Sequence, residues 1–262
     1  MMAHGRPAKV ALRVLGSGGL FSRRSLSRKV MRMTTTLITG ANKGLGYEAA
    51  RRLIADGHNV WIGARDPERG LAAADALGTR FVQLDVTDDG SVAAAAEHVA
   101  AEGGLDVLVN NAGIVGARKP PAEVTPADLQ EVFATNVFGV VRVTRGFLPL
   151  LARSENPVVV NVSSGMGSLT RTSDPDLLES TLISTVYAPS KSALNMLTTQ
   201  YAKAFPDIRI NAVDPGYTAT DFNGHRGTKP VEQGAEIIVR MAKLDRSGPS
   251  GQFVDENGTV PW

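Results

Sequence analysis

The chain has 262 residues, 43% of them hydrophobic, and contains no cysteine; this suits one large globular domain and excludes disulfides, thiolate metal sites and a cysteine nucleophile. The four histidines show no metal-ligand spacing, and no apolar run approaches the roughly 18 residues of a membrane span, so we expect neither a metal nor a membrane-embedded protein. The formal net charge is +2, and its distribution is more informative than its sum.

Positive charge is concentrated at the start of the chain. Residues 1–33 carry eight Lys or Arg and no Asp or Glu, which leaves 20 basic and 26 acidic residues, a balance of −6, in the remainder. A mildly acidic body lacks the electrostatic footprint of nucleic-acid binding. The basic arm is compatible with a targeting segment or a polyanion-binding tail. Because Met33 directly precedes the first strand-like run, we prefer a disordered extension (1–33) before one cytoplasmic catalytic domain (34–262).

From Met33 onward, strand and helix patterns alternate along the chain. Strands are predicted at 36–39, 59–63, 81–84, 105–109, 157–162 and 208–213, and helices at 45–55, 88–101, 126–151 and 186–205. Alternation of this kind is typical of a parallel sheet covered on both faces. With right-handed crossovers, it predicts an α/β fold: a single-domain, doubly wound parallel sheet of the Rossmann-like type.

A glycine-rich turn links the first predicted strand to the first helix. Its sequence is Thr39-Gly-Ala-Asn-Lys-Gly-Leu-Gly46, with the spacing G-x-x-x-G-x-G. Glycines permit close approach of the backbone, and a helix N-terminus presents unpaired N–H groups to a pyrophosphate. A strand before and a helix after this turn favour dinucleotide binding over an ordinary turn.

The end of the second predicted strand bears on the choice of cofactor. An acidic side chain there would accept from the ribose hydroxyl of NAD, but Ala64 occupies this position and Arg65 follows it. Arg65 and Lys43 of the glycine turn can pair with a phosphate. These residues favour NADP(H), whereas the nearby Asp66 leaves NAD open as an alternative.

A phenol and an ammonium stand one helical turn apart in Tyr187-Ala-Pro-Ser-Lys191, 23 residues after Ser164. A fixed positive charge favours the ionised form of a tyrosine, so Lys191 is expected to lower the Tyr187 pKa. Proline is tolerated in the first turn of a helix, so Pro189 predicts that Tyr187 stands close to the helix start. Taken alone, such a pair also occurs on solvated helices.

Together, these motifs resemble the short-chain dehydrogenase/reductase family, and the glycine turn is most similar to its NADPH-dependent carbonyl reductase branch. The resemblance covers residues 34–262. Further matches follow in the family's order: Asp85-Val86, Asn110-Asn-Ala-Gly113, Asn136, Ser163-Ser164, Tyr187 with Lys191, Asp214-Pro-Gly-Tyr-Thr218, and Ser250-Gly-Gln-Phe-Val254 with Pro261-Trp262.

The resemblance implies four catalytic residues. Tyr187 would protonate a carbonyl oxygen, and Lys191 would lower the tyrosine pKa and bond the nicotinamide ribose. Ser164, chosen over Ser163 because the family uses the second of the pair, would donate to the substrate oxygen. Asn136 would hold a water that links Lys191 to solvent.

The resemblance also implies the cofactor-binding residues, with Thr218 bonding the nicotinamide carboxamide and Val213 or Tyr217 packing nearby. The set is Gly40, Asn42, Lys43, Gly44, Leu45, Gly46, Arg65, Asp85, Val86, Asn111, Ala112, Gly113, Tyr187, Lys191, Pro215, Gly216 and Thr218.

One departure from the family's common pattern is the longer gap between Ser164 and Tyr187, where the polar stretch 170–179 predicts an extra loop beside the site. Met166, Leu169 and this loop are expected to shape the substrate pocket. A larger insertion here accompanies a monomer in the carbonyl reductase branch, so dimer, tetramer and monomer all stay open. The segment after Thr218 is short and is expected to offer little lid.

The sequence therefore predicts an NADP(H)-dependent oxidoreductase that transfers hydride from NADPH to a small ketone, aldehyde or quinone. Two alternatives stay open. One is an NAD-dependent secondary alcohol dehydrogenase, and the other is a non-catalytic NADP(H)-binding sensor or scaffold, which would not need the four catalytic residues together.

Overall fold

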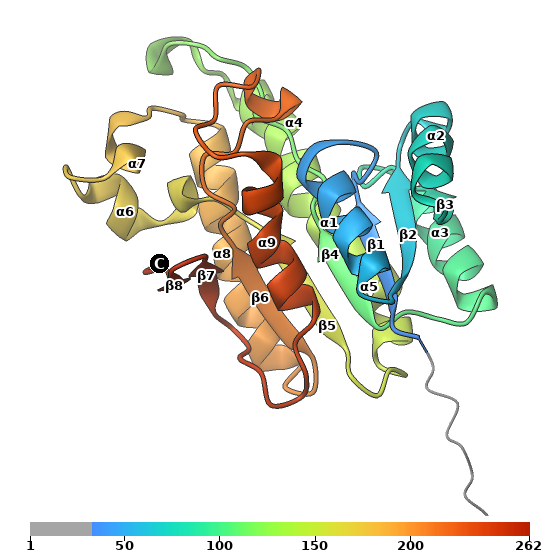
Figure 1. Ribbon diagram of the computed structural model, residues 1–262. Helices are drawn as coiled ribbons and strands as arrows, with labels where there is room; N and C mark the ends of the chain where they lie inside the picture. Colours follow the sequence, from blue (N-terminus) through green and yellow to red (C-terminus); the bar gives the residue numbers. More distant parts are fainter. Residues whose placement is uncertain (1–32) are drawn as a thin grey trace, which may run out of the picture. The chain divides into compact units, whose positions relative to one another are not determined.

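The computed structural model describes residues 33–262, and residues 1–32 of the predicted N-terminal extension lie outside this range. The described residues build one eight-stranded sheet in the order β3-β2-β1-β4-β5-β6-β7-β8 (Figure 1). All neighbours are parallel except β7 and β8, so the predicted doubly wound α/β fold is confirmed. The strands are β1 (Thr35–Thr39), β2 (Asn59–Ala64), β3 (Arg80–Gln83), β4 (Val107–Asn110), β5 (Val158–Val162), β6 (Arg209–Val213), β7 (Phe253–Asp255) and β8 (Gly258–Thr259).

Helices connect the strands and cover the sheet. They are α1 (Gly44–Ala55), α2 (Pro67–Leu77), α3 (Asp89–Ala101), α4 (Pro126–Phe133), α5 (Val140–Leu151), α6 (Leu169–Ser173), α7 (Leu178–Thr181), α8 (Tyr187–Ala204) and α9 (Val231–Ala242). A π-helical stretch, Ala134–Gly139, joins α4 to α5, so the single long helix predicted there is continuous but locally widened. The sequence analysis did not predict α2, α9, β7 or β8. In residues 33–262, no helix has the length and apolar character that crossing a membrane requires.

Alternate strand residues enter two separate cores, one on each face of the sheet. Ile38 of β1 belongs to the core that contains α1, α2 and α9. Its neighbour Leu37 belongs to the core that contains α3 and α5, with α8 packed against it. The same alternation is seen in β5, where Val158 and Val160 face the first core and Val159 faces the second. Burial on both faces explains why these strands read as continuous apolar runs.

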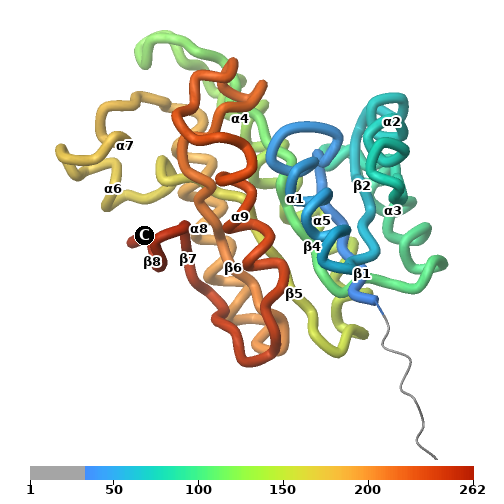
Figure 2. Tube along the Cα trace, in the orientation of Figure 1, coloured from blue at the N-terminus to red at the C-terminus, as the bar shows by residue number. Residues whose placement is uncertain are grey.

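The predicted loop between β5 and α8 contains two short helices, α6 and α7, instead of irregular chain throughout. The tube in Figure 2 shows this segment beside the C-terminal end of the chain. The contact is direct, because the carbonyl oxygen of Trp262 accepts hydrogen bonds from the backbone N–H and hydroxyl of Thr170, at 3.1 and 2.8 Å.

Candidate active site

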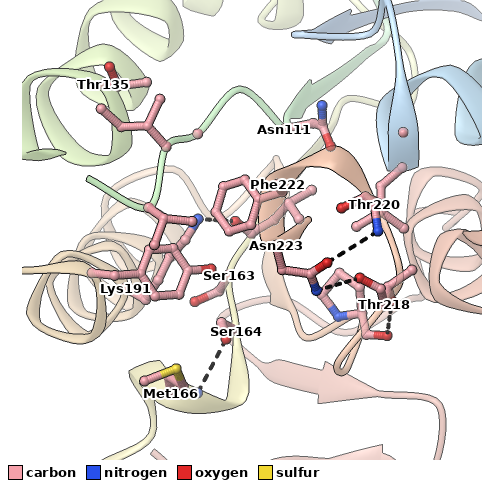
Figure 3. Close-up of a pocket in the computed structure, with 18 of the residues that line it drawn as sticks. Asn111, Thr135, Ser163, Ser164, Met166, Lys191, Thr218, Thr220, Phe222 and Asn223 are labelled. Carbon is pink, nitrogen blue, oxygen red and sulfur yellow. Dashed lines mark hydrogen bonds between the residues drawn. The ribbon is translucent and has the colours of Figure 1, made fainter. Parts of the chain in front are cut away.

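A cavity of about 860 Å³ opens at the carboxyl ends of the parallel strands, the edge at which open α/β sheets bind ligands. It is lined by the turns after β1, β2, β4, β5 and β6 and by the segment around α7. Figure 3 shows Ser164 and Lys191 on one side of this cavity, Thr218 and Asn223 on the other, and Phe222 between them. Of the residues predicted to bind cofactor or to act in catalysis, all line the cavity except Gly46 and Asn136.

Two glycines of the first turn have left-handed backbone conformations, with φ of 63° at Gly40 and 59° at Gly44. A Cβ atom on Gly40 would also lie 3.0 Å from the Cα of Ala112. Gly46 lies behind the turn, where a Cβ would be 2.5 Å from the amide nitrogen of Asn111. That nitrogen donates to the carbonyl oxygens of Thr39 and Gly40, at 2.8 and 3.2 Å. Gly46 and the Asn111 side chain therefore shape the turn.

At the end of β2, the cationic side chain of Arg65 lines the cavity, whereas the carboxylate of Asp66 is used elsewhere. Arg65 is exposed and lines the cavity. Asp66 instead caps α2 by accepting from the backbone N–H of Arg69 at 3.1 Å, and it pairs with the Arg69 side chain at 3.4 Å. Lys43 pairs with Asp221 across the cavity at 2.9 Å. Asp66, the acidic residue that made NAD an alternative cofactor, is thus used to cap the N-terminus of α2.

The two serines at the end of β5 have different surroundings. Ser163 is buried and donates to the side-chain oxygen of Asn195 at 2.6 Å. Ser164 is half-buried and lies beside the Tyr187 phenol, whose pKa it lowers. Its hydroxyl also accepts from the backbone N–H of Met166 at 3.3 Å. Of the pair, Ser164 is therefore the one beside the tyrosine hydroxyl, and its catalytic role stays a prediction.

Tyr187 is the first residue of α8, and Pro189 lies in the first turn, where it breaks no helix hydrogen bond. The ammonium of Lys191 is 5.6 Å from the centre of the tyrosine ring. It is 4% exposed and donates to the carbonyl oxygen of Val162 at 2.7 Å. Burial lowers the pKa of Lys191 to about 8.

The pKa of Tyr187 is shifted in the direction opposite to the prediction. Burial raises the pKa of its phenol, the hydrogen bond with Ser164 lowers it, and the negative charge of Asp214 raises it further. The net shift is upward, opposite to the lowering expected from Lys191, because loss of hydration penalises the phenolate more than the nearby groups stabilise it. The phenol is accordingly protonated at neutral pH.

Asn136 is completely buried in the π-helical stretch and faces the backbone of Ile114. Its oxygen accepts from the N–H of Ile114 and its nitrogen donates to the carbonyl of Ile114, both at 2.9 Å. The nitrogen also donates to the Ser190 hydroxyl at 3.0 Å. Ile114 lines the cavity. Asn136 does not line it, and it contacts the site by hydrogen bonding to the backbone of Ile114.

Thr218 is buried and lines the cavity, and its contact with the nicotinamide carboxamide stays a prediction. Its hydroxyl donates to the carbonyl oxygens of Pro215 and Gly216, at 3.1 and 3.3 Å. A hydroxyl keeps acceptor lone pairs when it donates. Gly216 has a φ of 74°, which a residue with a side chain would rarely adopt.

Several residues of the cavity wall were not predicted from the sequence. The short segment after Thr218 covers more than expected, because its Phe222 packs edge-to-face on Tyr187 with ring centres 5.6 Å apart. Leu182 and Ile183, which follow the predicted loop 170–179, also line the cavity beside Leu178 of that loop, and Ile183 is 80% exposed. Apolar side chains next to a polar stretch are a sequence signal that could have indicated these wall residues. For Phe222 the sequence carries no such signal.

Comparison with known proteins gives consistent matches. Residues 34–230 match the sequence profile described as short chain dehydrogenase. The (−)-isopiperitenone reductase of Mentha piperita is 33% identical, over 83% of this chain and 94% of that protein. Salutaridine reductase of Papaver bracteatum is 32% identical, over 86% of this chain and 95% of that protein. The crystal structure of NADPH-bound carbonyl reductase from chicken fatty liver superposes with a TM-score of 0.79 at 28% identity, over 88% of this chain and all of that chain.

Proposed function

The chain belongs to the short-chain dehydrogenase family and is an oxidoreductase, and from this premise we propose that it reduces small apolar ketones with NADPH. The observation that carries the proposal is the joint placement of Ser164, Tyr187 and Lys191 on one wall of a cavity whose opposite end is the glycine turn. A protonated phenol beside a hydroxyl donor is suited to giving a proton to a carbonyl oxygen.

NADP(H) fits the residues that line the cavity. Gly40 and Gly44 let the backbone at the α1 N-terminus line the cavity, where a pyrophosphate would accept from backbone N–H groups. Lys43 and Arg65 supply two cations for the phosphate that distinguishes NADPH from NADH. A related structure, the carbonyl reductase of chicken fatty liver, is described as NADPH-bound. When bound, NADPH supplies the hydride.

The residues of this chain supply the proton and hold the substrate. Tyr187 donates its phenolic proton to the carbonyl oxygen, and its raised pKa keeps it in the acid form that reduction needs. Ser164 donates a second hydrogen bond, steadying the charge that grows on that oxygen. Lys191 keeps a positive charge beside the phenol below about pH 8. We assign Asn136 a positioning role through Ile114.

The apolar wall supports an apolar ketone as the substrate. Leu178, Leu182, Ile183 and Phe222 line the cavity with partly exposed side chains, and covering such surface on binding is favourable in proportion to the area removed from water. Relatives of the chain are named as isopiperitenone and salutaridine reductases. The cytoplasmic location and the oligomeric state stay predictions.

The test is a panel of ketones, aldehydes, quinones and secondary alcohols, read by the absorbance of NADPH. We expect reduction of cyclic apolar ketones with NADPH in preference to NADH. Oxidation of alcohols with NAD as the faster reaction would favour the alcohol dehydrogenase. Tight NADPH binding without turnover of any carbonyl compound would reject the proposal in favour of a sensor.

A further inference from the structure

The side chain of Arg171, in α6, lies among three carboxylates that come from three different elements. Its guanidinium is 3.0 Å from Asp214 at the end of β6, 2.6 Å from Asp255 in β7 and 3.5 Å from Glu179 in α7. The Arg171 side chain is 21% exposed, and those of Asp214 and Asp255 are 5% and 10% exposed. The mechanism proposed above uses neither this cation nor these contacts.

The cluster places one positive charge against buried negative charges. Burial raises the pKa of Asp214, while hydrogen bonds from the backbone of Gly216 and Gly165 and the charge of Arg171 lower it. A planar guanidinium can bond two carboxylates at once, which an ammonium does less well. Without Arg171, Asp214 and Asp255 would be buried charges lacking this partner, an arrangement that is strongly unfavourable.

The carboxylates that pair with Arg171 contact both the turn after β5, which carries Ser164, and the loop that follows β6. Asp214 accepts from the backbone N–H of Gly216 at 2.9 Å. Glu179 and Asp214 also pack against Gly165, the residue after Ser164; a Cβ atom there would lie 2.2 Å from the Glu179 oxygen and 2.9 Å from the Asp214 oxygen. Arg171 therefore fixes the distance between α7 and these two parts of the site.

Part of the apolar wall lies on the helix that carries Glu179. Leu178 belongs to α7, and the side-chain hydrogen bonds of Ser180 and Thr181 stay within this short segment. The ion pair of Arg171 with Glu179 links α7 to the sheet through Asp214 and Asp255. By contrast, α6 has an additional attachment, since Ser168 donates to the carbonyl oxygen of Pro261 at 2.6 Å.

We propose that Arg171 is a positioning residue that holds the segment 174–185 as the apolar wall of the substrate cavity and thereby sets the affinity for the carbonyl substrate. This rests on the proposed function for the identity of the substrate. The structural part, that Arg171 orders this wall, is independent of any activity. Arg171 touches no reacting atom in this scheme and acts through Glu179 and Asp214.

Hydrogen–deuterium exchange of the full chain tests the structural part. Arg171→Gln is expected to speed exchange in peptides covering 174–185 and to leave those of β1 and α1 unchanged. Arg153→Gln is the matched control, because this exposed arginine after α5 lies outside the cavity lining, and it should change neither. Unchanged exchange in 174–185 of folded Arg171→Gln would overturn the inference.

The consequence for substrate binding is tested by steady-state kinetics. The substrates are NADPH and the ketone that the unmodified protein reduces fastest. Arg171→Gln should raise KM about tenfold or more while kcat falls less than about threefold. A fall in kcat of about tenfold or more with KM unchanged would show instead a role in the transition state, and it would overturn the assignment. If the unmodified protein reduces no ketone, the proposed function fails and the exchange experiment alone decides on Arg171.

Two milder variants keep the test decisive if Arg171→Gln does not fold. Arg171→Lys retains the charge without the planar fork, and Asp255→Asn removes one carboxylate while leaving the contact with Asp214. Both are expected to speed exchange in 174–185, to a smaller extent. If neither does so, the inference is rejected.

Discussion

The ammonium of Lys191 lies 5.6 Å from the centre of the Tyr187 ring and donates to the carbonyl oxygen of Val162 at 2.7 Å. The lysine is thus fixed by the backbone at the end of β5, the strand that also carries Ser164 at its exit. Positive charge and phenol lie on α8, the serine hydroxyl follows β5, and the Lys191–Val162 hydrogen bond joins these two elements; a fixed geometry of this kind is what a proton donor needs.

Removing the Tyr187 hydroxyl should abolish proton donation while preserving packing. We expect Tyr187→Phe to lower kcat for ketone reduction about a hundred- to ten-thousand-fold, with NADPH affinity unchanged, because the ring can keep its contact with Phe222. The matched control is Tyr201→Phe on the same helix, whose ring stacks on Phe205. Full activity of Tyr187→Phe, measured by NADPH absorbance, would contradict the assigned role.

The pH dependence of reduction should report Lys191. Its pKa is lowered to about 8 by burial, so the positive charge is present below that pH and lost above it, whereas Tyr187, with its raised pKa, stays protonated across this range. We expect kcat/KM to be constant near neutral pH and to fall above about pH 8 with the loss of one proton.

The control for this titration is Lys191→Arg, since a guanidinium keeps its charge at all accessible pH values. Its alkaline decline should move to higher pH, even if its maximal rate is lower. A decline at the same pH in both proteins would assign the titration to another group.

Charge reversal at the end of β2 should change the cofactor preference. Arg65→Asp is expected to weaken NADPH binding about ten- to a hundredfold, the range for a lost hydrogen bond to a charged group, and to affect NADH little. Cofactor fluorescence titration measures both constants. Arg69→Gln is the control, because Arg69 is exposed and pairs with Asp66. Equal weakening for both cofactors would exclude phosphate recognition by Arg65.

Truncation of Asn136 should act on stability as well as on activity. Asn136→Ala leaves the N–H and carbonyl of Ile114 without their partner, and we expect a loss of about 2–4 kcal/mol in the free energy of unfolding by urea. Asn156→Ala is the comparison, since Asn156 makes its side-chain donation to a single carbonyl, that of Leu244. A loss no larger than that of Asn156→Ala would contradict the positioning role.

The missed helices show where the sequence pattern was weak and where it was overlooked. α2 buries Gly70, Ala73 and Ala74, so it has no stripe of large apolar side chains; Gly70 is small because the Phe81 ring packs on it. Its capping signal at Asp66 was nevertheless present in the chain. α9 has a clear buried face, including Ile237 and Ile238, and this periodicity is readable in the sequence.

The sequence by itself determined the alternation of strands and helices, and with it the position of each motif at a strand end. Parallel strands bring their carboxyl ends to one edge of the sheet, so Gly40, Ser164 and Thr218 had to meet near the same cavity. Periodicity and turn chemistry are local properties, and a linear pattern is sufficient to read them.

Only the tertiary structure decided the direction of the Tyr187 pKa shift, the separate surroundings of Ser163 and Ser164, and the cluster around Arg171. Each depends on burial and on partners distant in the chain: Asp214 and Asp255 lie 43 and 84 residues from Arg171. The energy of a charge depends on the water it loses and on the groups that replace that water. Neither quantity exists until the chain has folded, and no local pattern encodes them.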